Sequence, residues 1–391
     1  MPILVTCCPF VKSIVSIFSI GKFGFPGGVS LAVSRRDVEV GVLCILRELC
    51  VGCLCARPSF RRASVSSTGC DIVNCPLAFA NMGKLRISIV EFLNTAPLVW
   101  GFTDGPLEGR YDLSFAVPSQ CAEDLKAGRA DVGIIPAIEY QRMENVVALP
   151  GMAVAAKNEV RSILVVSKVP IDQARSFALD TNSRSSVGLV RVLCQRHWSI
   201  APEFIDSAPD ADEMLARADA ALIIGDPALR LRLKVDALEA KVPQGKDCCG
   251  SGDDEPLVKN VETLFVYDVA QQWREMTGRP CVLAIWVARR GAVTPEIVAD
   301  FQASREYGLS HIGEIAEGAA LKLDLPPRAL ERYLTENIDF SLDEENLAGL
   351  NLYYEECARA GLIPRFRELE FAGTVSAATR NAVNAQQKVA R

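Results

Sequence analysis

Histidine is nearly absent from this sequence, which has only His197 and His311 among its 391 residues. Imidazole is the side chain best suited to proton transfer near neutral pH, so few candidates exist for a histidine base. His197 ends an apolar helical pattern, where it can interact with the terminal carbonyl groups, and His311 lies in a polar stretch typical of a surface. We therefore expect neither histidine to be catalytic.

Familiar catalytic and nucleotide-binding motifs are also missing. The chain has no G-x-G-x-x-G after a strand, no G-x-x-x-x-G-K-[ST], no H-E-x-x-H and no G-x-S-x-G. These absences remove the usual support for nucleotide binding, zinc proteolysis and serine hydrolysis. We expect no cofactor and no metal ion.

Uninterrupted apolar runs and clusters of one charge are lacking as well. Residues 1–20 are apolar but are broken by Lys12, and they lack the basic start of an export signal. The formal charge is -6, and lysine and arginine are scattered. We therefore expect a cytoplasmic protein with no nucleic-acid or membrane partner, which would hold an anionic ligand by local groups.

Cysteine is plentiful but unevenly distributed, because eight of the 14 cysteines precede Met82. Cys50-Val-Gly-Cys53-Leu-Cys55 has metal-like spacing but no second pair at zinc-finger distance. Since Met82-Gly-Lys-Leu-Arg-Ile opens like a first strand, we expect translation to start there and residues 1–81 to be a misassigned or disordered extension. The later cysteines fit reduced thiols.

From Met82 onward, apolar strand-like runs alternate with helical patterns, which is typical of βαβ units and a mainly parallel sheet. The alternation repeats after residue 172, and a strand at 282–288 precedes a helical region at 295–367. We predict an α/β fold with lobe 1 at 82–172 plus 279–372, lobe 2 at 173–278, and a hinge at two crossings near 170 and 279. A cleft between the lobes would bind the ligand. We also expect an exposed loop at 241–261 and a disordered tail at 373–391.

Three polar segments lie where a strand ends and a helix begins, which is where open α/β sheets bind ligands. In the first, Asn94 or Thr95 can simply cap a helix that has Pro97 in its first turn. In the second, Ser162 can bind ligand or bond to the backbone at the hinge. The third, residues 180–187, has more hydroxyls than one cap needs before a helix expected from Val187, and it favours an anion cradle.

The sequence resembles the chorismate dehydratases of the futalosine route to menaquinone over about Lys84 to Ala372. The resemblance rests on the order of motifs, which are Leu93-Asn94-Thr95-Ala96-Pro97-Leu98, Val117-Pro118-Ser119, Ala130-Asp131-Val132-Gly133, Ile138-Glu139-Tyr140, Val160-Arg161-Ser162-Ile163, Thr181 to Val187, Ala220 to Asp226 and Trp273 to Gly278. Asn337-Ile338-Asp339-Phe340 fits the family's C-terminal end. The resemblance implies a two-lobed fold like that of type 2 periplasmic binding proteins.

The resemblance also implies a lyase that removes water from chorismate to give 3-[(1-carboxyvinyl)oxy]benzoate. By analogy Asn94 is the catalytic residue, and the substrate-binding residues are Thr95, Ser162, Thr181, Asn182, Ser183, Ser185 and Ser186. The proton acceptor is predicted to be the enolpyruvyl carboxylate of the substrate, because no histidine is well placed.

The sequence departs from the family at Pro136-Ala137, where a pair of serines often precedes Ile-Glu-Tyr. Two alternatives stay open. A sister enzyme of the same pathway, which forms a dihydroxynaphthoate, relies on a histidine that residues 180–190 lack. A non-catalytic solute-binding protein of the same fold would need an export signal.

Overall fold

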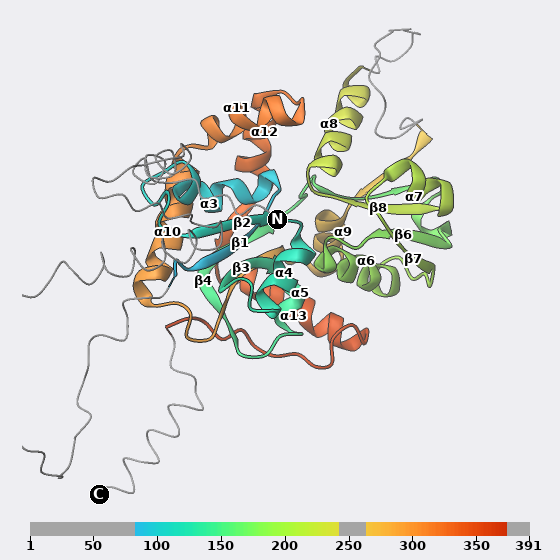
Figure 1. The fold of residues 1–391 in the computed structure, drawn as a ribbon. Helices are drawn as coiled ribbons and strands as arrows, with labels where there is room; N and C mark the ends of the chain where they lie inside the picture. Colours follow the sequence, from blue (N-terminus) through green and yellow to red (C-terminus); the bar gives the residue numbers. More distant parts are fainter. Residues whose placement is uncertain (1–82, 242–262, 374–391) are drawn as a thin grey trace, which may run out of the picture. The chain divides into compact units, whose positions relative to one another are not determined.

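The structure is a computed structural model that describes residues 83–241 and 263–373 (Figure 1). The expected extension at 1–81, the Cys50 to Cys55 segment, nearly all of the expected loop at 241–261 and the tail after residue 373 lie outside the described residues. Among the described helices, none is long and apolar enough to cross a membrane. Each of the four cysteines in this part is buried and free of a disulfide.

The first sheet has six strands in the order β11-β4-β10-β3-β1-β2 (Figure 1). Strand β1 is parallel to β2 and β3, whereas β10 is antiparallel to β3 and β4, and β11 to β4. The buried runs in β1 and β3 are continuous and, apart from Ser88, apolar, as expected for strands covered on both faces. The strands are β1 (Arg86–Val90), β2 (Asp112–Ala116), β3 (Val132–Pro136), β4 (Val146–Ala156), β10 (Cys281–Arg289) and β11 (Asp339–Leu342).

The second sheet has five strands in the order β7-β6-β8-β5-β9. Strand β6 is parallel to β7 and β8, and β5 is antiparallel to β8 and β9. The strands are β5 (Ile163–Ser167), β6 (Ser176–Asp180), β7 (Glu203–Ser207), β8 (Ala220–Ile224) and β9 (Phe265–Asp268). Their helices are η3 (Ile171–Gln173), α6 (Arg184–Arg196), α7 (Ala211–Arg217), α8 (Gly225–Lys241) and α9 (Val269–Thr277).

The two sheets share one arrangement, in which three parallel strands are followed by an antiparallel strand that enters from the other sheet. These entering strands, β5 and β10, run opposite to their neighbours, so the expectation of a mainly parallel sheet is wrong. The pairing of β5 also places the first crossing between Ala156 and Ile163, earlier than the expected boundary at residue 172. An apolar run carries no mark of the sheet with which it pairs, which explains the error.

The remaining helices belong with the first sheet. The region expected to be helical from residue 295 also contains β11 and a π-helix, neither of which was expected. The elements are a 3-10 helix η2 (Leu93–Thr95), α3 (Ala96–Thr103), α4 (Pro118–Lys126), α5 (Ala137–Tyr140), α10 (Pro295–Ser310), α11 (Ile312–Leu323), α12 (Pro327–Arg332), the π-helix η5 (Tyr333–Asn337) and α13 (Glu344–Arg359).

Helices α3 and α10 pack closely enough to fix where α3 begins. A Cβ atom at Gly308 would lie 2.0 Å from the carbonyl oxygen of Pro97, and one at Gly101 would lie 2.5 Å from the Cα of Ser304. Ser304 Oγ donates a 3.1 Å hydrogen bond to the carbonyl of Leu98. The backbone of α10 therefore packs directly against the backbone of the first turn of α3, next to Asn94 and Thr95.

One buried carboxylate joins the first crossing to helix α9. Asp268 accepts hydrogen bonds from the backbone N–H groups of Val160 (3.1 Å), Arg161 (2.6 Å), Ala270 (3.0 Å) and Gln271 (3.0 Å). Arg161 has a φ of 64°, which a non-glycine residue adopts only when its surroundings enforce it. This clamp positions Ser162, the next residue.

Candidate functional site

A small cavity lies between the ends of the two sheets, and its lining is mostly apolar with a few polar side chains. The space in which the centre of a water molecule fits is about 40 Å³, enough for only a few waters. Five of the eight predicted site residues line it, namely Asn94, Thr95, Ser162, Ser183 and Ser186. The other residues that line it are Val90, Phe92, Pro118, Pro136, Val154, Ile163, Ile224, Gly225, Leu283 and Ala284.

Asn94 and Thr95 bond to each other instead of capping helix α3. Thr95 occupies the N-cap position but makes no side-chain bond to the helix, and its hydroxyl donates to Asn94 Oδ1 at 3.3 Å. Thr95 is 1% exposed and Asn94 9%. The interpretation of these residues as ordinary caps is therefore wrong. This bond uses only the oxygen of the Asn94 amide, so it leaves the N–H donors to other partners.

Ser162 bonds through its side chain to a tyrosine that the sequence did not point to. The hydroxyl of Tyr333 donates to Ser162 Oγ at 2.8 Å, and both residues are almost fully buried. The Ser162 carbonyl accepts from Gly225 N at 2.8 Å, so its backbone contact is separate from its hydroxyl. Tyr333 also interacts with the side chain of Asn94, and burial raises the pKa of its phenol, which stays neutral.

The second lobe contributes two hydroxyls at the start of helix α6. Ser183 Oγ and Ser186 Oγ lie 2.9 Å apart. Ser183 is the N-cap residue, but its side chain makes no capping bond to a backbone N–H of the helix, which begins at Arg184 and not at the expected Val187. The first turn of α6 therefore combines two hydroxyls with N–H groups that lack a side-chain cap, a setting that attracts anions.

Three predicted residues lie elsewhere. Thr181 is exposed and lines a separate pocket with Arg184 and Arg191. Asn182 contributes its backbone, which accepts from Ser119 N at 2.9 Å and donates to Asp180 at 2.9 Å. Ser185 is fully buried, and its hydroxyl accepts from Ile138 N at 3.2 Å.

Several hydrogen bonds and ion pairs hold the lobes against each other around the cavity. Leu93 N donates to Asp226 Oδ1 at 3.1 Å, and burial raises the pKa of Asp226. Arg184 pairs with the buried Glu139 at 3.0 Å. With the bond between Ser119 and Asn182, we call these three pairs the closing contacts. With the closing contacts formed, the cleft is closed. Because the cavity holds only a few waters, the closing contacts must separate before a larger substrate can enter.

Among the described residues that line the cavity, none is an acid or a base, and their polar side chains are one amide and four hydroxyls. The two histidines lie elsewhere. His197 follows α6 with Nε2 4.0 Å from Glu275, and His311 places Nδ1 2.7 Å from the carbonyl of Tyr307. The nearby Asp180 ends β6, and burial raises its pKa to about 6.

The Pro136-Ala137 departure affects the cavity at one of its two positions. Pro136 lines the cavity, where it adds apolar surface in place of a hydroxyl. Ala137 is buried, and its carbonyl accepts from the Tyr354 hydroxyl at 2.8 Å.

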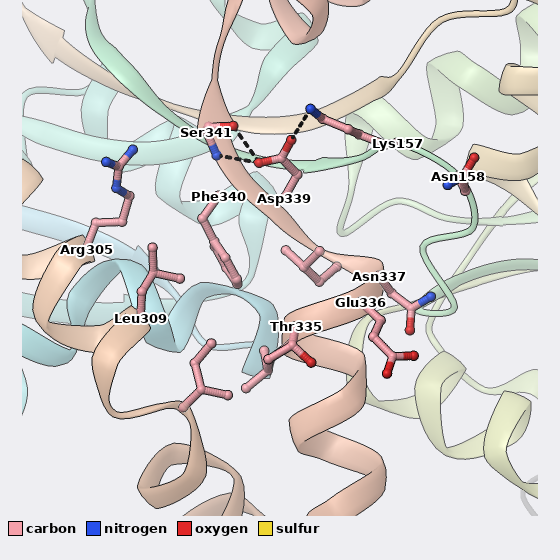
Figure 2. A pocket seen from close by; sticks show the side chains of 13 residues that line it. Lys157, Asn158, Arg305, Leu309, Thr335, Glu336, Asn337, Asp339, Phe340 and Ser341 are labelled. Atoms are coloured by element: carbon pink, nitrogen blue, oxygen red, sulfur yellow. Dashed lines mark hydrogen bonds and ion pairs between the residues drawn. The ribbon is translucent and has the colours of Figure 1, made fainter.

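A larger pocket, of about 640 Å³, lies beside the first crossing and contains none of the predicted site residues. Figure 2 shows Lys157 and Ser341 directed toward Asp339 in it. Lys157 lies 3.5 Å from Asp339 and 3.1 Å from Asp343, so its charge is neutralised locally. Within residues 83–241 and 263–373, no group of three or more histidine, cysteine or acidic side chains could hold a metal ion.

Two sheets of one arrangement, two crossings and a cavity between the sheets define a two-lobed α/β fold of the periplasmic-binding-protein class. The chain belongs to the menaquinone biosynthesis family, whose model matches residues 85–359. A relative described as chorismate dehydratase, from Thermus thermophilus, is 27% identical over 271 residues, which cover 69% of this chain and 93% of that protein.

Solved structures are similar at lower identity. Protein AF1704 from Archaeoglobus fulgidus aligns with a TM-score of 0.52 and 15% identity over 72% of this chain and 98% of its own. The alkanesulfonate-binding protein SsuA from Xanthomonas axonopodis pv. citri, bound to MOPS, aligns with a TM-score of 0.49 and 15% identity over 73% of this chain and 96% of its own. The similarity to AF1704 supports the fold of this chain and says nothing about its function.

Proposed function

We propose that this protein is a chorismate dehydratase, a cytoplasmic lyase of the futalosine route that forms 3-[(1-carboxyvinyl)oxy]benzoate without a cofactor. The observation that carries the proposal is the cavity lining, whose described residues offer hydroxyl and amide donors but no acid or base. Membership of the menaquinone biosynthesis family and the Thermus thermophilus relative support it.

The chemistry suits such a lining because the substrate supplies most of the driving force. The C3 hydrogen of chorismate is vinylogous to the ring carboxylate, so its removal gives a delocalised dienolate. The dienolate expels the C4 hydroxyl, which leaves as water, and the ring becomes aromatic. The protein has to stabilise the charge that grows on the ring carboxylate and orient the leaving hydroxyl.

Asn94 is the proposed catalytic residue. Because Thr95 occupies its amide oxygen, its N–H groups are available to the reacting end of the substrate. Ser162, Ser183 and Ser186 are proposed to bind the carboxylates with the first turn of α6. A charge-assisted hydrogen bond contributes roughly 1.5 to 3 kcal/mol, so a few of them can hold a dianion without an arginine in the lining.

The proposed proton acceptor is the enolpyruvyl carboxylate of chorismate itself. It takes the C3 proton and can then pass it to the departing hydroxyl, so the overall step releases one water and needs no protein base. Within 83–241 and 263–373, no titratable side chain lines the cavity, which favours this substrate-assisted route over a base from the protein.

The test is to incubate the full chain with chorismate and to follow the aromatic product by ultraviolet absorbance and mass. We expect loss of one water from chorismate, at a rate that Asn94→Ala lowers by about 10²- to 10³-fold. A folded protein that binds chorismate without converting it would reject the lyase and point to a binding protein. Conversion of the cyclised futalosine derivative instead would identify the sister reaction.

A further inference from the structure

We infer that Tyr333 is a positioning residue that fixes the Ser162 hydroxyl as a donor toward the cavity, so that the site selects a carboxylate over its neutral isostere. The inference deepens the proposed function and rests on it for the natural substrate. Its test uses binding alone, so the two can fail separately.

The first step is the direction of the hydrogen bond between the two hydroxyls. Tyr333 donates to Ser162 Oγ at 2.8 Å, as expected because a phenol is a stronger donor than an aliphatic hydroxyl. Each hydroxyl has one proton, and that of Tyr333 is engaged. Ser162 therefore keeps its own proton, and since it lines the cavity, that proton is available to a ligand.

The second step is the amide on the other side of Tyr333. Asn94 accepts from Thr95 through Oδ1 at 3.3 Å and interacts with the Tyr333 side chain. Thr95, Asn94, Tyr333 and Ser162 thus form one buried chain, which we call the hydroxyl–amide network. The Ser162 hydroxyl proton and an N–H of Asn94 remain as donors. A carboxylate accepts them in charge-assisted hydrogen bonds, which are roughly twice as strong as those to the neutral oxygen of an amide ligand.

The third step is the rigidity of the segment that carries Tyr333. The π-helix Tyr333–Asn337 contacts the first crossing at both ends, through Tyr333 to Ser162 and through Asn337 Nδ2 to the Glu159 carbonyl at 3.4 Å. Figure 2 shows Thr335, Glu336 and Asn337 of the same helix around the larger pocket. The segment thus contacts Ser162, which lines the cavity, and Glu159 in the first crossing. Single π-turns occur often at functional sites.

The test compares two isosteric probes, 3-methoxybenzoate and 3-methoxybenzamide, by calorimetry on the full chain. We expect the wild type to prefer the carboxylate, and Tyr333→Phe to lower that preference roughly tenfold, the worth of one charge-assisted hydrogen bond. Without the Tyr333 proton, nothing fixes the Ser162 hydroxyl as a donor toward the cavity, so the carboxylate probe should lose more affinity than the amide probe. Tyr354→Phe is the matched control, because it removes a buried phenol bonded to the Ala137 carbonyl and should leave the ratio unchanged.

A double-mutant cycle separates positioning from a general structural role. In Ser162→Ala the preference should already be reduced, and adding Tyr333→Phe should change it no further. Equal loss of affinity for both probes in Tyr333→Phe, or a full additional effect in the Ser162→Ala background, would overturn the inference. So would a wild type that binds both probes equally or binds neither. A preserved preference in a protein that does not dehydrate chorismate would support the inference while rejecting the proposed function.

Discussion

The two sides of the cavity are built differently. On the side of the first lobe and its crossing, Thr95, Asn94, Tyr333 and Ser162 form the hydroxyl–amide network, which is nearly closed to solvent. On the side of the second lobe, Ser183 and Ser186 bond to each other at an uncapped helix start. The first side is preorganised, whereas the second can exchange its internal bond for a ligand. We expect catalysis to depend on the first side and affinity on the second.

The largest effect that we expect is on catalysis, from a substitution on the first side of the cavity. Asn94→Ala should lower kcat by about 10²- to 10³-fold, as the loss of a preorganised donor does in other enzymes, with little change in KM. Ser186→Ala should raise KM by roughly tenfold, the worth of one hydrogen bond to a charged group, with kcat nearly unchanged. Steady-state kinetics with chorismate measure both. A raised KM with normal kcat in Asn94→Ala would reverse the assignment of the two sides.

A second prediction concerns what holds the first side in place. Gly308→Ala should destabilise the protein by about 1 to 3 kcal/mol, since its Cβ would clash with the Pro97 carbonyl and push α10 away from α3. Gly318→Ala in α11, where nothing lies within 4 Å of the new Cβ, should stabilise by up to about 1 kcal/mol. Denaturant unfolding measures both. Equal stability of the two variants would show that α3 is not held by this contact.

A third prediction concerns the pH dependence of stability and Asp180, which ends β6 in the second lobe. Burial raises the pKa of Asp180 to about 6, above its value in the unfolded chain, so the folded state binds the proton more tightly. The charged carboxylate therefore lowers stability as pH rises from about 4 to above 6. Asp180→Asn keeps an oxygen for Asn182 N and should be more stable than the wild type at pH 8, by at most about 3 kcal/mol, but not at pH 4. Thermal unfolding across this range measures the difference, and an advantage independent of pH would contradict the assignment.

The sequence predicted site residues where their position next to a strand end was visible in the local pattern. Polar residues beside strand ends pointed to Asn94 and Thr95, which follow β1, and to Ser162, which precedes β5, and the structure brings all three to one cavity. Tyr333 carried no such signal, because it lies 171 residues from Ser162 in a region with a helical pattern and reaches the site through an unexpected π-helix. The pairing of β5 was equally hidden, since apolar runs do not specify their partners.

The start of helix α6 explains the remaining differences and supplies the smallest predicted effect. With the helix expected from Val187, all the preceding hydroxyls belonged to one loop and could converge on a ligand. Because the helix begins at Arg184, its turn directs Ser186 to the cavity and Ser185 to the Ile138 backbone, while Thr181 stays exposed outside. Thr181→Ala should therefore change kcat and KM for chorismate less than about twofold, as surface substitutions usually do. Ser186→Ala is the positive control in the same assay. A large rise in KM in Thr181→Ala would mean that Thr181 contacts the substrate once the closing contacts separate. The second side of the open cleft would then include Thr181 in addition to Ser183 and Ser186.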